Sequence, residues 1–159
     1  MKESLFRGLC FGLTSGIITT LGLMVGLYSF TGSKMVVIGG IMTIAIADSM
    51  SDALGIHMSE ESQKKSSHKN VLSATLSTFS SKLVFSSTFL IPALFLELGT
   101  AILVSVVWGI VALSVLSYFI AKSRKEKPLG VILEHVIIAV AVVFVTRFVG
   151  AWISTLFGA

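Results

Sequence analysis

Two carboxylates in an otherwise apolar segment are the residues of this chain best suited to chemistry. Asp48 and Asp52 lie within residues 35–58, a stretch of Ile, Val, Met, Ala and Gly long enough to cross a bilayer. An ionised carboxylate in hydrocarbon costs roughly 3 kcal/mol even on lenient insertion scales, so it persists where it meets a partner, an ion or water. Two hard oxygen ligands one helical turn apart suit a divalent cation such as Mn²⁺ or Fe²⁺, or protons that exchange with it.

The neighbours of these carboxylates predict one small and polar strip along the helix. At 100° per residue, the strip holds Ile41, Ala45, Asp48, Ser51, Asp52, Gly55, Ser59 and Ser62. A strip of this kind is expected to line a cavity or a helix interface, because lipid would leave its carboxylates unsatisfied. His57 is expected to face away from it.

One basic residue could neutralise Asp48 instead of an ion. Asp48 and Lys82 both fall at ~16 Å from the same end of their predicted helices, given 1.5 Å per residue. A buried pair of this kind orients helices without transporting anything, so a structural pair and a charge-coupling role both stay open. Asp52 has no basic residue predicted opposite it, which favours Asp52 as the metal ligand.

Membrane helices are the elements that must position these side chains. Hydrophobic residues make up 54% of the chain and charged residues 13%, and a span needs about 20 apolar residues. Five segments qualify, namely 8–30, 35–58, 71–95, 100–121 and 130–157. Because the connections are short, residues 1–159 are predicted to form one all-α, five-helix transmembrane domain in the lipid bilayer.

The basic residues predict the orientation of that domain. Nine of the twelve Lys and Arg residues fall before the first span, between the second and third, or between the fourth and fifth. These segments share one side, so we expect a cytoplasmic N-terminus and an outside C-terminus, in the cell (plasma) membrane. The net charge of +4 then follows from topology, and no nucleic-acid partner is expected. Glu60 and Glu61, in the 59–70 connection, could gather cations at the cytoplasmic entrance.

The first span carries glycines at helical spacing. Gly8, Gly12 and Gly16 form two consecutive GxxxG steps, a pattern that lets helix backbones approach closely in lipid. Packing within one subunit and the seam of a homodimer are both consistent with it.

No pattern in the sequence predicts an enzyme. The sequence has no nucleophile and base pair, phosphate-binding glycine loop or zinc spacing. Glu134 and His135 are expected at the solvated start of the last span, and the single Cys10 is expected to be a packing residue. No tightly bound cofactor is expected.

Several motifs resemble those of the vacuolar iron transporter family. TSGIITTLGLMVGL in the first span is similar to that family's N-D-G-L-V-T-T-x-A-L-V-x-G, and residues 51–63 are similar to its S-M-A-A-G-E-Y-x-S-x-x-S-Q. FLIPALF and VTRFVG resemble parts of its third and fifth helices. The resemblance covers nearly the whole chain. It implies a homodimeric transporter that moves Fe²⁺, Mn²⁺ or a similar ion out of the cytosol in exchange for protons, between the first two helices of each subunit.

The chain also departs from the family pattern. The family's Asp in the first span falls on Ser15, its Glu in the second span on Ile56, and its Met on Asp52. The resemblance then implies a site shifted along the helix, with Asp48 and Asp52 as carboxylates and Ser15 as a weak oxygen ligand. A carboxylate in place of a thioether hardens the site and favours Mn²⁺ or Mg²⁺. The family's Glu-rich cytoplasmic insert is missing.

Three functions therefore stay in view. The leading prediction is a divalent-metal transporter coupled to protons. The alternatives are a non-transporting structural or accessory membrane protein on the same scaffold, and a carrier of another small solute.

Overall fold

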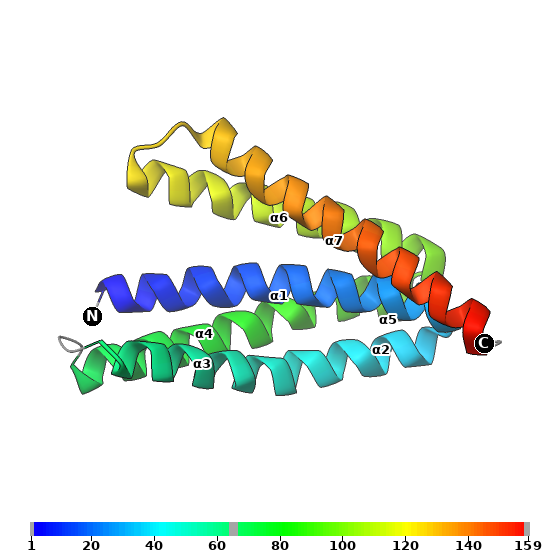
Figure 1. The fold of residues 1–159 in the computed structure, drawn as a ribbon, viewed down its shortest axis with the longest axis horizontal. Coiled ribbons are helices and arrows are strands. Elements are labelled where there is room, and N and C mark those ends of the chain that lie inside the picture. Colours follow the sequence, from blue (N-terminus) through cyan, green and yellow to red (C-terminus); the bar gives the residue numbers. More distant parts are fainter. Residues whose placement is uncertain (1, 64–66, 158–159) are drawn as a thin grey trace.

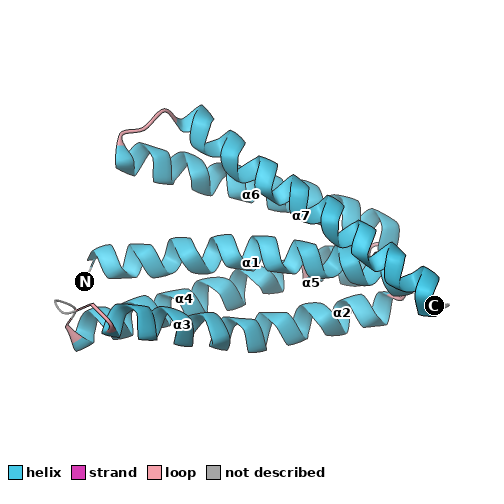
Figure 2. Ribbon diagram, viewed as in Figure 1, coloured by secondary structure: helices cyan, strands magenta, loops and turns pink. Residues whose placement is uncertain are grey.

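The computed structural model is a bundle of long helices (Figures 1 and 2), and it describes residues 2–63 and 67–157. Its elements are α1 (Lys2–Thr31), α2 (Lys34–Thr43), a π-helical segment η1 (Ile44–Asp48), α3 (Ser49–Glu61), α4 (His68–Thr88), α5 (Leu90–Phe95), α6 (Leu98–Arg124) and α7 (Pro128–Phe157). No strand occurs in this part of the chain. The predicted all-α class is confirmed.

The five predicted spans are confirmed as helices long and apolar enough to cross a membrane. They cover Glu3–Thr31, Lys34–Glu61, His68–Phe95, Leu98–Arg124 and Pro128–Phe157. The second span joins α2, η1 and α3, and the third joins α4 and α5. Each span extends a few residues beyond at least one end of its predicted apolar segment, because the helix continues through flanking residues that the hydropathy pattern left out.

Short polar signals separate these helices. Gly32 adopts a left-handed φ of +59°, which a glycine accepts without strain, and this turn reverses the chain after α1. Ser33 then caps α2 by accepting from the Val36 amide. Lys34 donates from Nζ to the Leu94 and Leu96 carbonyls, at 3.0 and 2.8 Å, and so ties the start of α2 to the end of α5.

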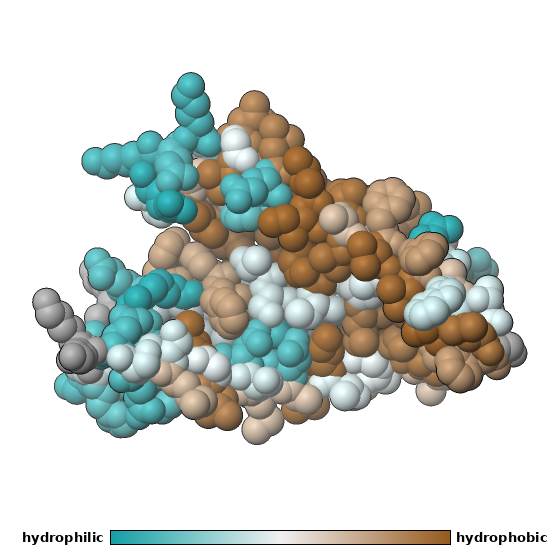
Figure 3. Space-filling model, viewed as in Figure 1, coloured by the Kyte–Doolittle hydropathy of each residue, from teal (hydrophilic) through white to brown (hydrophobic). Residues whose placement is uncertain are grey.

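Helix α1 lies at the centre of the bundle in Figure 1, with α2, α3 and α4 on one side and α6 and α7 on the other. The start of α1, the end of α3, the start of α4 and the α6–α7 connection share one end, and the end of α7 lies at the other. Figure 3 shows hydrophilic residues gathered at that first end on the visible face. The basic residues that the structure describes in these segments share an end, as predicted, while Lys64 and Lys65 lie outside the described residues. Which end faces the cytosol stays a prediction.

A core of buried aliphatic residues joins α1 to its neighbours. Ile17, Leu21 and Met24 of α1 are at most 1% exposed, and they cluster with Phe89 before α5 and Leu113 of α6. By contrast, α7 buries little of its surface and exposes apolar side chains along its length, as expected for a helix that faces lipid.

The glycine stripe of α1 packs against α4 of the same chain. A methyl group on Gly8 would collide with the Ala74 carbonyl and the Ser77 hydroxyl, and one on Gly12 would collide with the Thr78 carbonyl. Gly16 packs less tightly, since a methyl group there would lie 3.1 Å from the Ser86 hydroxyl and 3.4 Å from Lys82. Of the two predicted roles, the structure shows packing within one subunit, and these glycines are not available as a homodimer seam.

Candidate cation-binding site

The two carboxylates lie where the second span changes its helical geometry. Asp48 closes η1 and Asp52 lies in the first turn of α3. Just before η1, Thr43 donates its hydroxyl to the Gly39 carbonyl at 2.8 Å, a back-bond that bends helices. π-helical turns of this kind occur often at functional sites.

This π-helical turn makes part of the predicted strip wrong. The buried residues of the span follow steps of four, at Val37, Ile41, Ala45, Ser49 and Ala53. Ser51 is exposed and lines a groove with Asp48, as the prediction allows, whereas Gly55, Ser59 and Ser62 are exposed outside that groove. A π-turn holds more residues than an α-turn, so it shifts every later residue relative to a face predicted at 100° per residue.

Lys82 of α4 brings the two carboxylates together. Its Nζ atom donates to Asp52 Oδ2 at 2.5 Å and to Ser15 Oγ on α1 at 2.8 Å. It also lies 2.5 Å from Asp48 Oδ2, in an ion pair whose angle does not meet hydrogen-bond geometry. The predicted Asp48–Lys82 pair is therefore present, whereas the prediction that Asp52 has no basic partner is wrong. Ser15, expected near the site from the resemblance alone, contacts the lysine rather than either carboxylate.

A glycine makes room for the lysine stem. Lys82 is 0% exposed, and its Cγ atom would lie 3.4 Å from a methyl group added to Gly16. A larger residue there would press on both the stem and the Lys82 carbonyl. The glycine stripe therefore positions the charged site as well as the helices.

The charges of this cluster lie deep in the predicted membrane. Asp48 falls halfway along the 28-residue span Lys34–Glu61, and Lys82 falls halfway along the 28-residue span His68–Phe95. With all three groups ionised, two carboxylates and one ammonium leave one net negative charge at mid-depth. Such a charge is costly in hydrocarbon, and it favours the arrival of a cation.

A groove between α1 and the second span reaches Asp48. It has a volume of about 640 Å³ and is lined by Leu23, Leu27, Val36, Gly40, Thr43, Ile44, Ala47, Asp48 and Ser51. The Asp48 side chain is 30% exposed and that of Asp52 20%, so Asp48 is the more accessible carboxylate. An ion in the groove would meet Asp48 before the rest of the cluster.

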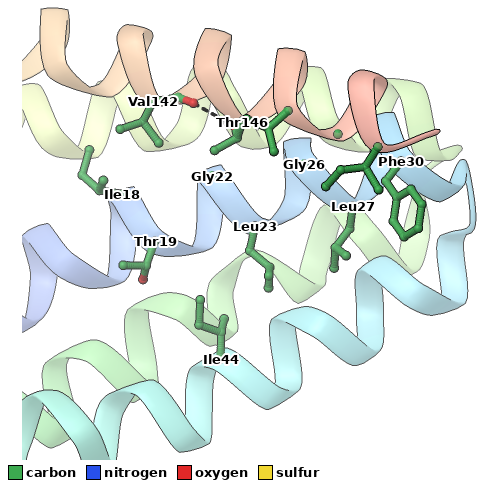
Figure 4. Close-up of a pocket in the computed structure, with 13 residues that line it drawn as sticks. Ile18, Thr19, Gly22, Leu23, Gly26, Leu27, Phe30, Ile44, Val142 and Thr146 are labelled. Atoms are coloured by element: carbon green, nitrogen blue, oxygen red, sulfur yellow. Dashed lines mark hydrogen bonds between the residues drawn. The ribbon is translucent and has the colours of Figure 1, made fainter. Parts of the chain in front are cut away.

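A second groove, of about 550 Å³, lies between α1 and α7 (Figure 4) and shares Leu23, Leu27 and Ile44 with the first. Its lining is apolar apart from Thr19 and Thr146, whose hydroxyls donate to carbonyls of their own helices, Ser15 and Val142, each at 2.8 Å. These two hydroxyl groups therefore donate within the protein and not into the groove. Because the rest of the lining is apolar, this groove suits an apolar chain better than an ion.

The two glutamates of the predicted acidic entrance lie in different surroundings, and their role as an entrance stays a prediction. Glu60 and Glu61 lie in the last turn of α3 rather than in a connection. Glu60 is 2% exposed and forms an ion pair with Arg7 of α1 at 3.2 Å, whereas Glu61 is exposed. Glu60 is thus part of the contact between α1 and α3, and Glu61 is the one of the two that faces outward. The sequence does contain a signal for this ion pair, because Arg7 and Glu60 carry opposite charges at the same end of two predicted spans.

The histidines lie outside the cluster. His57 contacts Thr75 of α4 through Nδ1 at 3.0 Å, which fits the expected interface away from the carboxylates. His135 contacts the buried Ser117 of α6 at 2.8 Å. It also lines a cavity at the α6–α7 end together with Glu134 and Cys10. Neither histidine joins Asp48 or Asp52.

Within residues 2–63 and 67–157, no group of three or more His, Cys, Asp or Glu side chains could hold a metal ion. The oxygen set of the cluster is two carboxylates and the Ser15 hydroxyl, and it surrounds an ammonium group. Comparison with protein-family models and with curated proteins gives no match to this chain. The fold is thus that of a multi-span helical protein with a charged cluster at mid-depth.

Proposed function

We propose that this protein is a membrane transporter of a divalent metal ion of the Fe²⁺ or Mn²⁺ type, which exports the ion from the cytosol in exchange for protons. One observation carries the proposal: two carboxylates hold a cation, the Lys82 ammonium, halfway along two membrane spans. A groove opens on Asp48 at that depth. Intramembrane ionisable groups beside a cavity mark ion pathways.

In this proposal, Asp48 and Asp52 are the metal ligands and would carry protons when no metal is bound. Carboxylate oxygens are the ligands that Mn²⁺ and Mg²⁺ prefer, and the absence of a sulfur ligand in the cluster favours these harder ions. Lys82 would be the balancing charge, and Ser15, which accepts a hydrogen bond from Lys82 Nζ, would orient it. The resemblance to the vacuolar iron transporter family supports the same function, and the plasma membrane with a cytoplasmic N-terminus is the location that we propose.

A homodimer is part of the proposal, and we place its contact on the second span. Small residues recur there every fourth position on the exposed surface, at Gly39, Thr43, Ala47, Ser51 and Gly55. A stripe of small residues lets helices approach closely in lipid. The strip borders the groove, so a second copy would also shield the part-exposed Asp48 carboxylate from lipid.

A structural role is the second candidate, and a specific observation favours it. The Lys82 ammonium contacts oxygen atoms from α1, η1 and α3, and so joins four elements at one point. A buried charge cluster of this kind can specify how helices pack without binding any solute. A carrier of another small cation would use the same groove.

Uptake into proteoliposomes tests the proposal. We expect the purified protein to take up Mn²⁺ when a pH gradient is imposed, and Asp48→Asn and Asp52→Asn each to abolish this uptake. Glu97→Gln is the matched control, because Glu97 is an exposed carboxylate at the start of α6. Absence of Mn²⁺ and Fe²⁺ uptake by the folded protein would contradict the transporter and leave the structural role.

A further inference from the structure

The Lys82 ammonium occupies the position that a bound metal ion would need. An ammonium has three donors and no acceptor, and Lys82 Nζ has three oxygen neighbours, on Ser15, Asp48 and Asp52. The Lys82 side chain is 0% exposed, so it is shielded from bulk solvent. The oxygen set therefore already holds a cation, and that cation is covalently attached to the protein.

A metal ion and the ammonium cannot use the same carboxylate atoms at once. Lys82 lies against Oδ2 of both Asp48 and Asp52. A divalent ion of the Mg²⁺ size needs oxygen ligands at about 2.1 Å, in the space that the ammonium fills. An ion that bridges the two carboxylates must therefore displace Lys82.

We propose that Lys82 is a tethered cation that competes with the transported ion for Asp48 and Asp52. This inference rests on the proposed function, because it concerns how the same site is regulated. While Lys82 stays between the carboxylates, the site is closed to other ions. A ligand that can bind only after a residue has moved away has an apparent affinity equal to its intrinsic affinity multiplied by the fraction of time that the site is open.

The geometry gives an order to the displacement. The contact with Asp48 lacks hydrogen-bond alignment, whereas those with Asp52 and Ser15 have it. Asp48 also faces the groove and is the more exposed carboxylate. The ion therefore meets Asp48 first, and Lys82 then gives up its contacts with Asp52 and Ser15.

The tether also sets which charge the site accepts. A monovalent ion has the same charge as the ammonium that it would replace, so it gains no Coulomb energy from the exchange. A divalent ion gains twice the attraction of the ammonium for the same carboxylates. Lys82 is thus a specificity-determining residue that excludes Na⁺ and K⁺ and admits divalent ions.

Binding of Mn²⁺ to the purified protein in nanodiscs tests this competition, with the Mn²⁺ electron-paramagnetic resonance signal as the measure of free ion. We expect Lys82→Met, which keeps the length of the stem, to bind Mn²⁺ about tenfold more tightly or better than the original protein. Na⁺ should weaken Mn²⁺ binding in this variant beyond ordinary ionic screening and not in the original protein. Lys82→Arg keeps the charge and should bind no more tightly than the original protein. Unchanged or weaker binding by folded Lys82→Met would overturn the inference.

A second variant covers the case in which Lys82→Met does not fold. Ser15→Ala leaves all three charges in place and removes one oxygen neighbour of the ammonium. If Lys82 competes with the ion, we expect Ser15→Ala to bind Mn²⁺ about tenfold more tightly, because the lysine-bound state loses one hydrogen bond from a charged donor. Equal or weaker binding by Ser15→Ala would count against competition.

Uptake by the same proteins separates this inference from the proposed function. Tighter binding by Lys82→Met without Mn²⁺ uptake by the original protein would uphold competition and contradict transport. Uptake by the original protein with unchanged binding in Lys82→Met would uphold transport and contradict competition.

Discussion

Helix α1 packs against α4 along its first half and against α7 along its second half, and glycines line both contacts. Against α4, the glycines alternate with hydrogen bonds between helices, because Thr78 donates to the Gly8 carbonyl at 3.1 Å and Ser86 to the Gly16 carbonyl at 3.4 Å. Against α7, Gly26 meets Gly150, whose added methyl group would strike the Gly26 carbonyl. There the Thr146 hydroxyl bonds its own helix.

This difference shows how the charged cluster can be tolerated. Lys82 lies on α4, the helix that is held to α1 by hydroxyl groups as well as by close packing. In lipid, apolar contact between helices has no hydrophobic driving force, and polar contacts add directional attraction. The hydrogen-bonded contact therefore fixes the position of the ammonium, whereas the apolar α1–α7 contact leaves a groove beside it (Figure 4).

Gly12→Leu is expected to have the largest effect on stability. The new side chain would strike the Thr78 carbonyl and the Ser81 hydroxyl, and backbone atoms cannot move away without separating α1 from α4. We expect a loss of about 3 kcal/mol, at the upper end of overpacking costs. Thermal unfolding in detergent measures it through Trp108, which stacks on Phe85 of α4 with ring centroids 5.9 Å apart.

The control for that change lies at the start of α7, away from the α1–α4 contact. A methyl group on Gly130 would meet nothing within 4 Å, so Gly130→Leu should leave the unfolding temperature almost unchanged. Using a Trp152→Phe background leaves Trp108 as the reporter. Equal losses of stability in Gly12→Leu and in the control would mean that close packing at Gly12 does not stabilise the α1–α4 contact.

Hydropathy alone predicts most of the fold, and the reason is physical. Each span must satisfy its own backbone hydrogen bonds in lipid, so a long apolar segment has few alternatives to a helix. The depth of Asp48 and Lys82 likewise follows from residue counts, which is why that pair could be predicted.

The sequence predicts less accurately which faces of the helices pack against one another. The predicted strip held both Asp48 and Asp52, but depths counted in residues matched Lys82 to Asp48 alone. The Lys82 ammonium reaches both carboxylates, which lie four residues apart. The burial of Glu60 against Arg7 depends on which helices are neighbours, and no local pattern contains that information. For the same reason, the sequence could not decide which helix packs against Gly8, Gly12 and Gly16.

Gly150→Leu is expected to have an intermediate effect. Its new side chain would meet the Gly26 carbonyl and Ser29, yet α7 borders an open groove and can shift away from α1. We expect a loss of about 1–2 kcal/mol, within the range for overpacking, measured by the same thermal unfolding. Gly130→Leu, on the same helix but with nothing within 4 Å, is the control. A loss larger than that of Gly12→Leu would reverse the comparison between the two contacts.

The smallest effect, and the sharpest test of the comparison, comes from two threonines with different hydrogen-bond partners. Thr78→Val removes a buried bond from α4 to the Gly8 carbonyl of α1, and Thr146→Val removes a bond within α7. Because the two changes have the same shape and chemistry, their difference isolates the bond between helices. We expect Thr78→Val to cost about 1 kcal/mol, as interhelical hydrogen bonds in membranes do. Thr146→Val should cost much less, since the Thr146 hydroxyl bonds only carbonyls of its own helix and its loss removes no bond between helices. Equal unfolding temperatures for the two variants would mean that close packing alone holds α1 to α4, and that the hydroxyl groups do not fix the position of Lys82.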